Sequence, residues 1–194
     1  MEMPLDALND ASDEALLVAF GNGDRAAARA LTLRLTPRVL GYAARLLGDR
    51  AEAEDVTQEA MLRLWRVAGQ WRQGEARVTT WLYRVVTNLC TDRLRRRRGV
   101  GLDSIEEPAD DAASAEDGLA RAQRLAALQE ALMRLPARQR QAVVLRHVEG
   151  LSNPEIAAVM EVSVEAVESL TARGKRGLAK ALAGRREELG YGDG

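Results

Sequence analysis

The chain of 194 residues contains one cysteine, Cys90, and one histidine, His147. A single cysteine cannot form an intramolecular disulfide, and these two residues are too few for a Cys/His zinc site. The longest apolar runs fall far short of the ~20 residues that a membrane span needs. The N-terminal residues are acidic and lack the cationic start and apolar core of a secretory signal. We therefore expect a cytoplasmic protein with no metal, no cofactor and no membrane insertion.

Aromatic residues are also scarce, at 4% of the chain, and no segment has a convincing strand pattern. Alanine, leucine and arginine are abundant instead, and apolar residues recur at helical spacing almost everywhere. The sequence therefore predicts an all-α protein. Its length fits either one ordinary domain or two small ones.

The distribution of charge favours two domains. Although the formal net charge is −1, residues 25–98 carry 16 basic and seven acidic side chains, and residues 121–186 carry 12 and six. Residues 99–120 have seven acidic side chains and no basic one, and such a segment is typical of a flexible linker. We expect two small helical domains suited to holding a polyanion at two places. They span residues 1–98 and 116–186, with a flexible acidic linker at 99–115 and an acidic tail at 187–194.

A helix-turn-helix pattern occupies residues 151–175 of the second domain. Ser152 and Glu155 have the spacing of a capping box that starts the first helix, and Ser163 is placed to cap the second. The outer face of the second helix carries short polar groups and cations, which suit base edges and phosphates in a DNA major groove. Its residues are Glu165, Ala166, Glu168, Ser169, Ala172, Arg173 and Arg176. An ordinary αα-hairpin with a solvated face would have the same local pattern.

Residues 50–68 predict a helix with two distinct faces. One is a buried stripe of Ala53, Val56, Ala60, Leu64 and Val67. The other combines acidic, amide and large apolar side chains, namely Asp55, Gln58, Glu59, Leu62 and Trp65. Such a combination favours docking of a basic partner, and the alternative is a solvated face with one exposed tryptophan.

A further long helix is predicted from Trp81 to Arg98, after a loop at 69–79 that carries Trp71. Opposite its apolar side, a line of residues recurs at helical spacing: Trp81, Arg84, Asn88, Thr91 and Arg95. Aromatic, guanidinium and amide groups in one line can stack on bases, pair with phosphates and read a base edge. These are the contacts that unpaired nucleic acid needs. The alternative is a surface helix whose arginines serve solubility.

Three segments in this order resemble the extracytoplasmic-function group of the sigma-70 family. They are AEDVTQEAMLRLW, TTWLYRVVTNLCTDRLRRRR and, beyond the acidic linker, LMRLPARQRQAVVLRHVEGLSNPEIAAVMEVSVEAVESLTARGKRGL. The resemblance covers roughly residues 12–184. It implies a dissociable subunit that directs bacterial core RNA polymerase to promoter DNA and helps to melt it. It also implies restraint by an anti-sigma factor until a stress signal arrives.

The resemblance implies roles for the residues singled out above. In that family the AEDVTQE-type helix docks on core polymerase, which gives a partner to Asp55, Gln58, Glu59, Leu62 and Trp65. The next helix and the loop before it recognise the unpaired minus-ten strand, a role that would fall to Trp71, Trp81, Arg84, Asn88 and Arg95. The helix-turn-helix reads the minus-thirty-five duplex, a role that would fall to Ser163, Glu165, Ala166, Glu168, Ser169, Arg173, Lys175 and Arg176.

The last module departs from the family pattern. Many members have glycine in the turn where this chain has Glu161, and a glycine and a lysine where it has Glu165 and Glu168. Because carboxylates near phosphates are repelled, either these acids accept from cytosine amino groups or the helix docks at a tilt.

Two other classes of function remain for comparison. A stand-alone helix-turn-helix repressor or activator would bind a palindrome as a dimer, but it leaves the first domain without a role. An enzyme finds no support, because the sequence has neither a nucleophile–base pairing nor a phosphate-cradling glycine loop.

Overall fold

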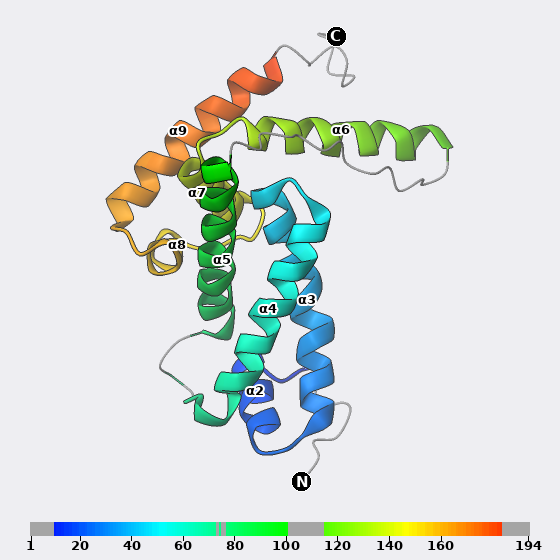
Figure 1. Ribbon diagram of the computed structural model, residues 1–194, viewed down its shortest axis with the longest axis vertical. Coiled ribbons are helices and arrows are strands. Elements are labelled where there is room, and N and C mark those ends of the chain that lie inside the picture. The colour runs from blue at the N-terminus through cyan, green and yellow to red at the C-terminus, as the bar shows by residue number, and fades with distance from the viewer. Residues whose placement is uncertain (1–9, 73, 75–76, 101–114, 184–194) are drawn as a thin grey trace.

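The computed structural model describes residues 10–72, 74, 77–100 and 115–183, and every regular element in these ranges is helical. The elements are α2 (Asp13–Gly21), α3 (Arg25–Leu47), α4 (Arg50–Val67), the short 3-10 helix η1 (Ala68–Gln70), α5 (Val78–Val100), α6 (Ala115–Met133), α7 (Ala137–His147), α8 (Asn153–Met160) and α9 (Val164–Ala183). The all-α prediction is confirmed for the described residues (Figure 1). None of the described helices is long and apolar enough to cross a membrane.

The helices of the N-terminal domain begin where a side-chain oxygen accepts hydrogen bonds from their free backbone N–H groups. The side chains of Ser12, Asp24 and Asp49 cap α2, α3 and α4. The start of α5 is capped from a distance, because Glu14 of α2 accepts from the backbone N–H of Val78 at 2.9 Å. Gly48 ends α3 in the left-handed conformation, which glycine adopts without strain, so α3 and α4 form a tight hairpin.

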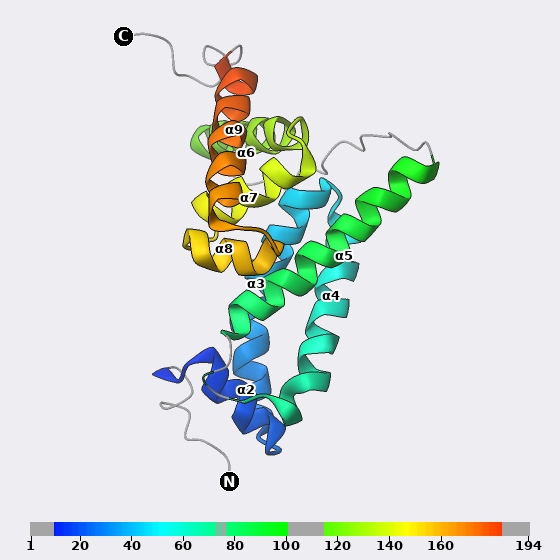
Figure 2. The ribbon, with the colours of Figure 1, turned by 90° about the vertical axis from the view of Figure 1, so that its left-hand side faces the viewer.

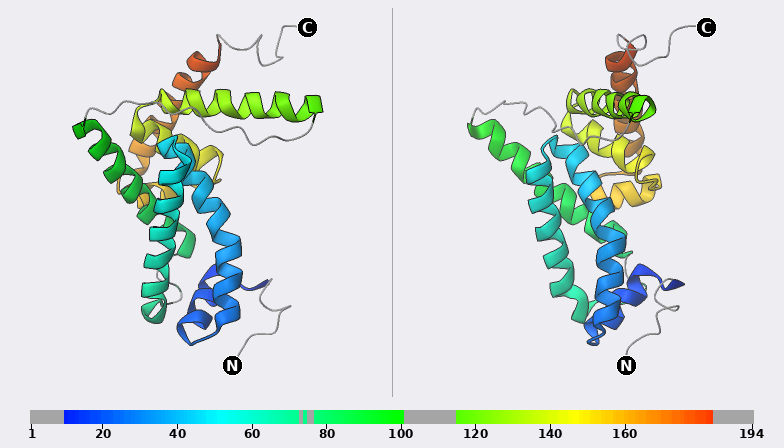
Figure 3. Two further views of the ribbon diagram at one scale, coloured as in Figure 1. Left: turned by 45° about the vertical axis from the view of Figure 1, so that its right-hand side comes forward. Right: turned by 90° about the vertical axis from the view of Figure 1, so that its right-hand side faces the viewer.

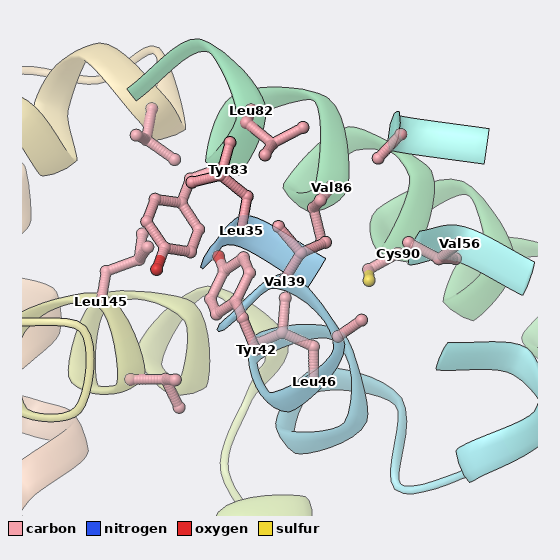
Figure 4. Close-up of a cluster of buried hydrophobic side chains, with 14 of the residues drawn as sticks. Leu35, Val39, Tyr42, Leu46, Val56, Leu82, Tyr83, Val86, Cys90 and Leu145 are labelled. Atoms are coloured by element: carbon pink, nitrogen blue, oxygen red, sulfur yellow. The ribbon is translucent and has the colours of Figure 1, made fainter. Parts of the chain in front are cut away.

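Helices α3, α4 and α5 enclose the N-terminal core, and Figure 3 shows α3 and α4 running side by side. The predicted buried stripe of α4 is confirmed at Ala53, Val56, Ala60 and Leu64, whereas Val67 is only half-buried. Figure 4 shows the side chains of all three helices meeting, with labelled members Leu35, Val39, Tyr42, Leu46, Val56, Leu82, Tyr83, Val86 and Cys90.

Helix α5 is longer than the sequence predicted. It begins at Val78, where that side chain is fully buried and Glu14 supplies a distant cap, and it continues to Val100. The two ends of the expected acidic linker are helical, since residues 99–100 belong to α5 and Ala115 begins α6. The rest of that linker and the tail at 187–194 lie outside the described residues.

The C-terminal domain is formed by α6 to α9. Helices α7 and α9 pack so closely that a Cβ at Gly174 would lie 2.4 Å from Val143 Cγ2. Leu132 near the end of α6 and Leu135 just beyond it are buried, but Leu125 of α6 is 57% exposed. The N-terminal half of α6 projects away from the other helices in Figure 1.

The two domains contact each other. Helix α8 lies against α5, and α6 and α7 contact α3, as Figure 2 shows. Leu145 of α7 is fully buried beside Tyr42 and Tyr83 in Figure 4, so one apolar cluster runs through both domains. The interdomain contact therefore involves α5 and α8, which carry parts of the predicted surfaces.

Candidate docking and nucleic-acid surfaces

The docking face of α4, formed by Asp55, Gln58, Glu59, Leu62 and Trp65, lies on the side of the helix opposite its buried stripe. Asp55, Gln58 and Leu62 are exposed, whereas Glu59 and Trp65 are half-buried. The ring of Trp65 is held edge-on against Phe20 of α2, with 5.0 Å between ring centroids. The structure thus brings the five predicted residues together on one surface.

A groove between α3 and α4 borders the docking face. It has a volume of about 380 Å³ and is lined by Thr32, Thr36, Leu40, Glu54, Thr57, Gln58, Met61, Leu62 and Trp65. Three of the five docking residues are among them, and Leu62 leaves 45% of its surface open to solvent. An apolar groove edged by acids suits an amphipathic partner with basic side chains.

The acids of the docking face are only weakly engaged within the chain. Asp55 pairs with Arg93 at 3.6 Å, and Glu59 pairs with Arg63, one turn further on, at 2.8 Å. The hydrogen bond from Arg63 lowers the pKa of Glu59 below its usual value, so this group is charged at neutral pH. Because exposed ion pairs of this kind contribute little to stability, both carboxylates remain able to exchange partners.

The predicted line on α5 consists of Trp81, Arg84, Asn88, Thr91 and Arg95. All are exposed except Trp81, which is half-buried. The ring of Trp71 approaches that of Trp81 nearly at right angles, with 6.1 Å between centroids. Trp71 Nε1 is buried without a hydrogen-bond partner among the described residues. Two indole rings therefore stand together at the N-terminal end of the line.

Two residues of this line make polar contacts with the C-terminal domain. Arg84 pairs with Glu161 at 2.5 Å, and Thr91 Oγ1 accepts from Gln141 Nε2 of α7 at 3.0 Å. Arg95, by contrast, pairs with Asp92 of its own helix at 3.1 Å. Asn88 lies between the two bridged positions and stays exposed, so its amide is accessible.

The predicted helix-turn-helix is confirmed as α8 and α9. Its capping box is complete: the Ser152 N–H donates to Glu155 Oε2 at 2.8 Å, and the Glu155 N–H donates to Ser152 Oγ at 3.5 Å. The Ser152 hydroxyl also donates to Glu155 Oε2 at 2.6 Å, and this bond, followed by the one from the Ser152 N–H, lowers the pKa of Glu155. Glu161 ends α8 in the left-handed region with φ of 54°, and Ser163 Oγ accepts from the Ala166 N–H at 3.2 Å to start α9.

The outer face of α9 carries the residues predicted for duplex DNA. Ala166 is half-buried, and the other seven are exposed: Ser163, Glu165, Glu168, Ser169, Arg173, Lys175 and Arg176. The two acids differ in their surroundings. Glu165 turns back to its own backbone N–H and to Ser163, which lowers its pKa, whereas Glu168 accepts from Asn153 of α8 at 3.5 Å. Glu165 therefore lies beside the cap of α9, and Glu168 lies beside α8.

Sequence reasoning missed the residues that join the two domains. Tyr83 Oη donates to Glu149, which lies between α7 and α8, and Arg77 pairs with Glu155 at 2.9 Å. Burial and the neighbouring carboxylate raise the pKa of Tyr83, so its hydroxyl stays protonated. Because the chain has few aromatic residues, a tyrosine beside the α5 line was an indication in the sequence that Tyr83 makes a specific contact. Its partner, however, lies 66 positions away in the sequence.

Across the ranges that the structure describes, no three histidine, cysteine, aspartate or glutamate side chains are grouped to hold a metal ion. Cys90 is buried, and burial raises the pKa of its thiol to about 12. His147 is exposed at the end of α7, where partial desolvation and then Lys175 and Arg146 lower its pKa.

Known families and relatives match both domains. The sigma-70 region 2 family model matches residues 31–100, and the sigma-70 region 4 model matches residues 125–178. The ECF RNA polymerase sigma factor SigM of Mycobacterium tuberculosis is 39% identical over 175 residues, which cover 90% of this chain and 86% of that protein. The RNA polymerase sigma-H factor of Pseudomonas aeruginosa is 33% identical, with coverage of 90% and 96%.

A solved structure has the same fold. The chain is similar to CnrH, whose structure was determined in complex with the cytosolic domain of CnrY, with a TM-score of 0.65 and 26% identity. The similarity covers 89% of this chain and 97% of CnrH. Since two family models and two relatives match along most of its length, the chain belongs to the sigma-70 family and is a sigma factor of the extracytoplasmic-function group.

Proposed function

We propose that this sigma factor directs core RNA polymerase to promoters through three surfaces with separate roles. The docking face of α4 binds core polymerase, the α5 line with Trp71 binds the unpaired minus-ten strand, and the outer face of α9 reads the minus-thirty-five duplex. The observation that supports this assignment is that each surface lies opposite the buried side of its helix. The proposed domains are residues 1–98 and 116–186, with the linker at 99–115 and the tail at 187–194.

The docking assignment rests on the groove between α3 and α4 and on the acids beside it. A basic amphipathic segment of polymerase would place an apolar side chain near Leu62 and Trp65 and its cations near Asp55 and Glu59. The double variant Asp55→Ala/Gln58→Ala should reduce co-elution with core polymerase while leaving the helical circular-dichroism signal unchanged, because both side chains are exposed. Arg121→Ala/Gln123→Ala, which alters two exposed residues of α6, is the matched control. Unchanged co-elution of the first variant would remove the docking assignment.

The minus-ten assignment rests on the chemistry of the α5 line. Opening a duplex costs a few kcal/mol per unstacked base, which a protein recovers by stacking the base on aromatic rings and bonding its edge. Trp71 and Trp81 supply the rings, and Asn88 supplies an amide that both donates and accepts. The exposed arginines Arg84 and Arg95 are placed along the same helix for the phosphates of the strand.

The minus-thirty-five assignment places the start of α9 in a major groove. Glu165 lies beside the Ser163 cap of α9 and is exposed. Glu168 remains as the acid that could accept from a cytosine amino group. Arg173 and Arg176 lie one and two turns further along and suit phosphates.

A transcription assay tests the function as a whole. Core polymerase with the purified chain should give run-off transcripts from a subset of a genomic promoter library, and core polymerase alone should not. The free chain should bind promoter duplex weakly, because neither small domain supplies a large polar interface. Nanomolar, sequence-specific binding of a palindrome by a dimer of the free chain would instead support the repressor class.

Partners and location follow from the same proposal. CnrH, 26% identical to this chain, was solved with the cytosolic domain of another protein, which supports restraint of this sigma factor by an anti-sigma factor. We infer that the chain works in the cytoplasm, where core polymerase and promoter DNA are found, and that it has no catalytic activity of its own. Recovery of a single protein that blocks run-off transcription by the purified chain would establish the restraint.

A further inference from the structure

The acids of the C-terminal domain differ in whether a cation neutralises them. Three glutamates each lie within ion-pair distance of an arginine, namely Glu149, Glu155 and Glu161. The two acids on the outer face of α9, Glu165 and Glu168, have no such partner among the described residues. They therefore keep their full negative charge on the surface that faces a polyanion in the proposed function.

Glu168 is contacted from the neighbouring helix by Asn153 of α8. Asn153 Nδ2 donates to Glu168 Oε1 at 3.5 Å, and Asn153 is half-buried whereas Glu168 is exposed. A hydrogen bond of this length is weak, so it limits where the carboxylate lies without satisfying it. An ionised carboxylate accepts at both oxygens, so Oε2 stays open to a further donor.

Asn153 has a rigid backbone. It is the first residue of α8 and lies between Ser152 and Pro154. On one side the capping box holds the chain through the bond from the Ser152 N–H to Glu155 at 2.8 Å. On the other side the ring of Pro154 fixes its own φ. The amide of Asn153 is therefore presented from a support that moves little, as a residue that orients another one requires.

The separation of Asn153 and Glu168 is set by the core of the helix-turn-helix. Ile156, Val159 and Met160 of α8 and Val167 of α9 are buried, and the two helices contact each other (Figure 2). Val167 directly precedes Glu168, so the packing of α9 on α8 also fixes the backbone that carries the carboxylate. The geometry of the pair therefore does not depend on the long hydrogen bond alone.

A carboxylate held in a major groove discriminates between bases, because it can only accept. Cytosine offers the amino group N4, whereas guanine and thymine offer acceptors at the corresponding edge. Adenine has an amino group at N6 but also an acceptor at N7, which a carboxylate would face as well. Opposite an acceptor the carboxylate loses water and gains no hydrogen bond, so the wrong base is rejected.

We propose that Asn153 is a positioning residue for Glu168, and that through this pair the sigma factor selects cytosine at one position of the minus-thirty-five element. The inference rests on the proposed reading of that duplex by α9. Glu168 touches the base, and Asn153 acts through Glu168. Because Glu168 also repels phosphates, the pair adds selectivity and lowers overall affinity.

Run-off transcription by the holoenzyme tests the base preference. Core polymerase with the full chain transcribes a pool of one promoter whose minus-thirty-five element is randomised, and the transcripts are sequenced. The wild type should favour cytosine over guanine and thymine at one position by about tenfold. Glu168→Ala should lose that preference alone and transcribe promoters without the cytosine more strongly than the wild type. Glu168→Gln, whose amide can pair with N6 and N7 of adenine, should shift the preference to adenine.

Variants of Asn153 test the positioning role in the same assay. Asn153→Ala should lower the cytosine preference by about threefold to tenfold at the same position, as the loss of one hydrogen bond to a charged group predicts. Asn153→Asp has the same size but repels Glu168 and should lower it at least as much, whereas Asn153→Gln keeps a donor and should retain part of it. In the Glu168→Ala background, Asn153→Ala should have no further effect at this position. A purely structural role would weaken every position together.

Glu165→Ala is the matched control, because it removes the other acid of the same face and should leave the cytosine preference unchanged. All variants should have the helical circular-dichroism signal of the wild type and co-elute with core polymerase. The inference is overturned if Glu168→Ala keeps the preference, as a tilted docking of α9 predicts, or if Glu165→Ala removes it. An unchanged preference in Asn153→Ala would overturn the positioning role. A wild type without preference at any minus-thirty-five position would instead overturn the proposed role of α9 itself.

Discussion

The α5 line and the outer face of α9, the two surfaces proposed to bind DNA, present different chemistry on different supports. Helix α5 packs into the core through its own residues Tyr83, Val86 and Cys90. Its line, together with Trp71, presents two indole rings and an amide. Helix α9 presents short polar groups, acids and cations, nearly all exposed. Large rings that must receive unstacked bases need a rigid support, whereas a duplex groove offers edges that short side chains reach directly. The first surface is also partly covered in the free chain, and the second is open.

The largest effect is expected from a substitution that destabilises the C-terminal domain, which carries the outer face of α9, and leaves the α5 line in place. Ile156 of α8 is fully buried, and Ile156→Ala should destabilise the C-terminal domain by about 2–5 kcal/mol, because the small domain cannot close the cavity. Ile156→Val should reduce the free energy of unfolding by only about 0.5–1.5 kcal/mol, and it is the milder control. Denaturant unfolding followed by circular dichroism measures both. Transcription that depends on the minus-thirty-five element should fail, while binding to a premelted minus-ten template should persist. Equal loss of both would show that the surfaces do not act independently.

The next effect concerns base recognition on α5. Asn88→Ala should impair open-complex formation and selectivity at one minus-ten base, with a cost of about 1–3 kcal/mol. A premelted bubble template removes the cost of strand opening but leaves the base contact, so it should rescue the variant only in part. Run-off transcription on duplex and bubble templates measures both terms. Transcription like the wild type on both would contradict the assignment of this face.

A smaller effect concerns the cap that holds the helix-turn-helix. Ser152→Ala removes the capping hydroxyl of α8 and should cost about 1 kcal/mol near neutral pH. Because hydrogen bonds from Ser152 lower the pKa of Glu155, the charged form adds stability above its ordinary value of 4.5, and this stability is lost as pH falls through the lower value in the folded chain. Unfolding of wild type and variant at neutral and acidic pH should show the difference shrinking in acid. A difference that grows in acid would contradict this account of the cap.

The smallest effect is expected for a phosphate contact on α9. Arg176→Ala should weaken promoter binding almost equally across sequences and lower the slope of log affinity against log salt by about one unit. Lys180→Ala changes another exposed cation of α9 outside the predicted surface and should leave the slope unchanged. Binding titrations at several salt concentrations measure the slope. A changed base preference in Arg176→Ala would mean that this residue reads bases instead.

Much of this molecule follows from local sequence signals. Helix starts were encoded by nearby oxygens, as Ser152 and Ser163 show, and the buried stripe of α4 followed from apolar spacing at Ala53, Val56, Ala60 and Leu64. The line on α5 and the outer face of α9 were predictable for the same reason, since residues three and four apart on a helix share a face. Local signals suffice here because capping and periodicity act within a turn or two.

The tertiary structure alone decided which of these faces meet. Tyr83 binds Glu149 across 66 positions and Arg77 binds Glu155 across 78, and no periodicity within either helix encodes such partners. Leu125 has the spacing of a core residue but stays exposed, because the core available to α6 ends before it. Glu161 pairs with Arg84, a contact that exists only because α8 lies on α5. Such choices depend on the burial and charge that two distant surfaces share, which neither segment contains by itself.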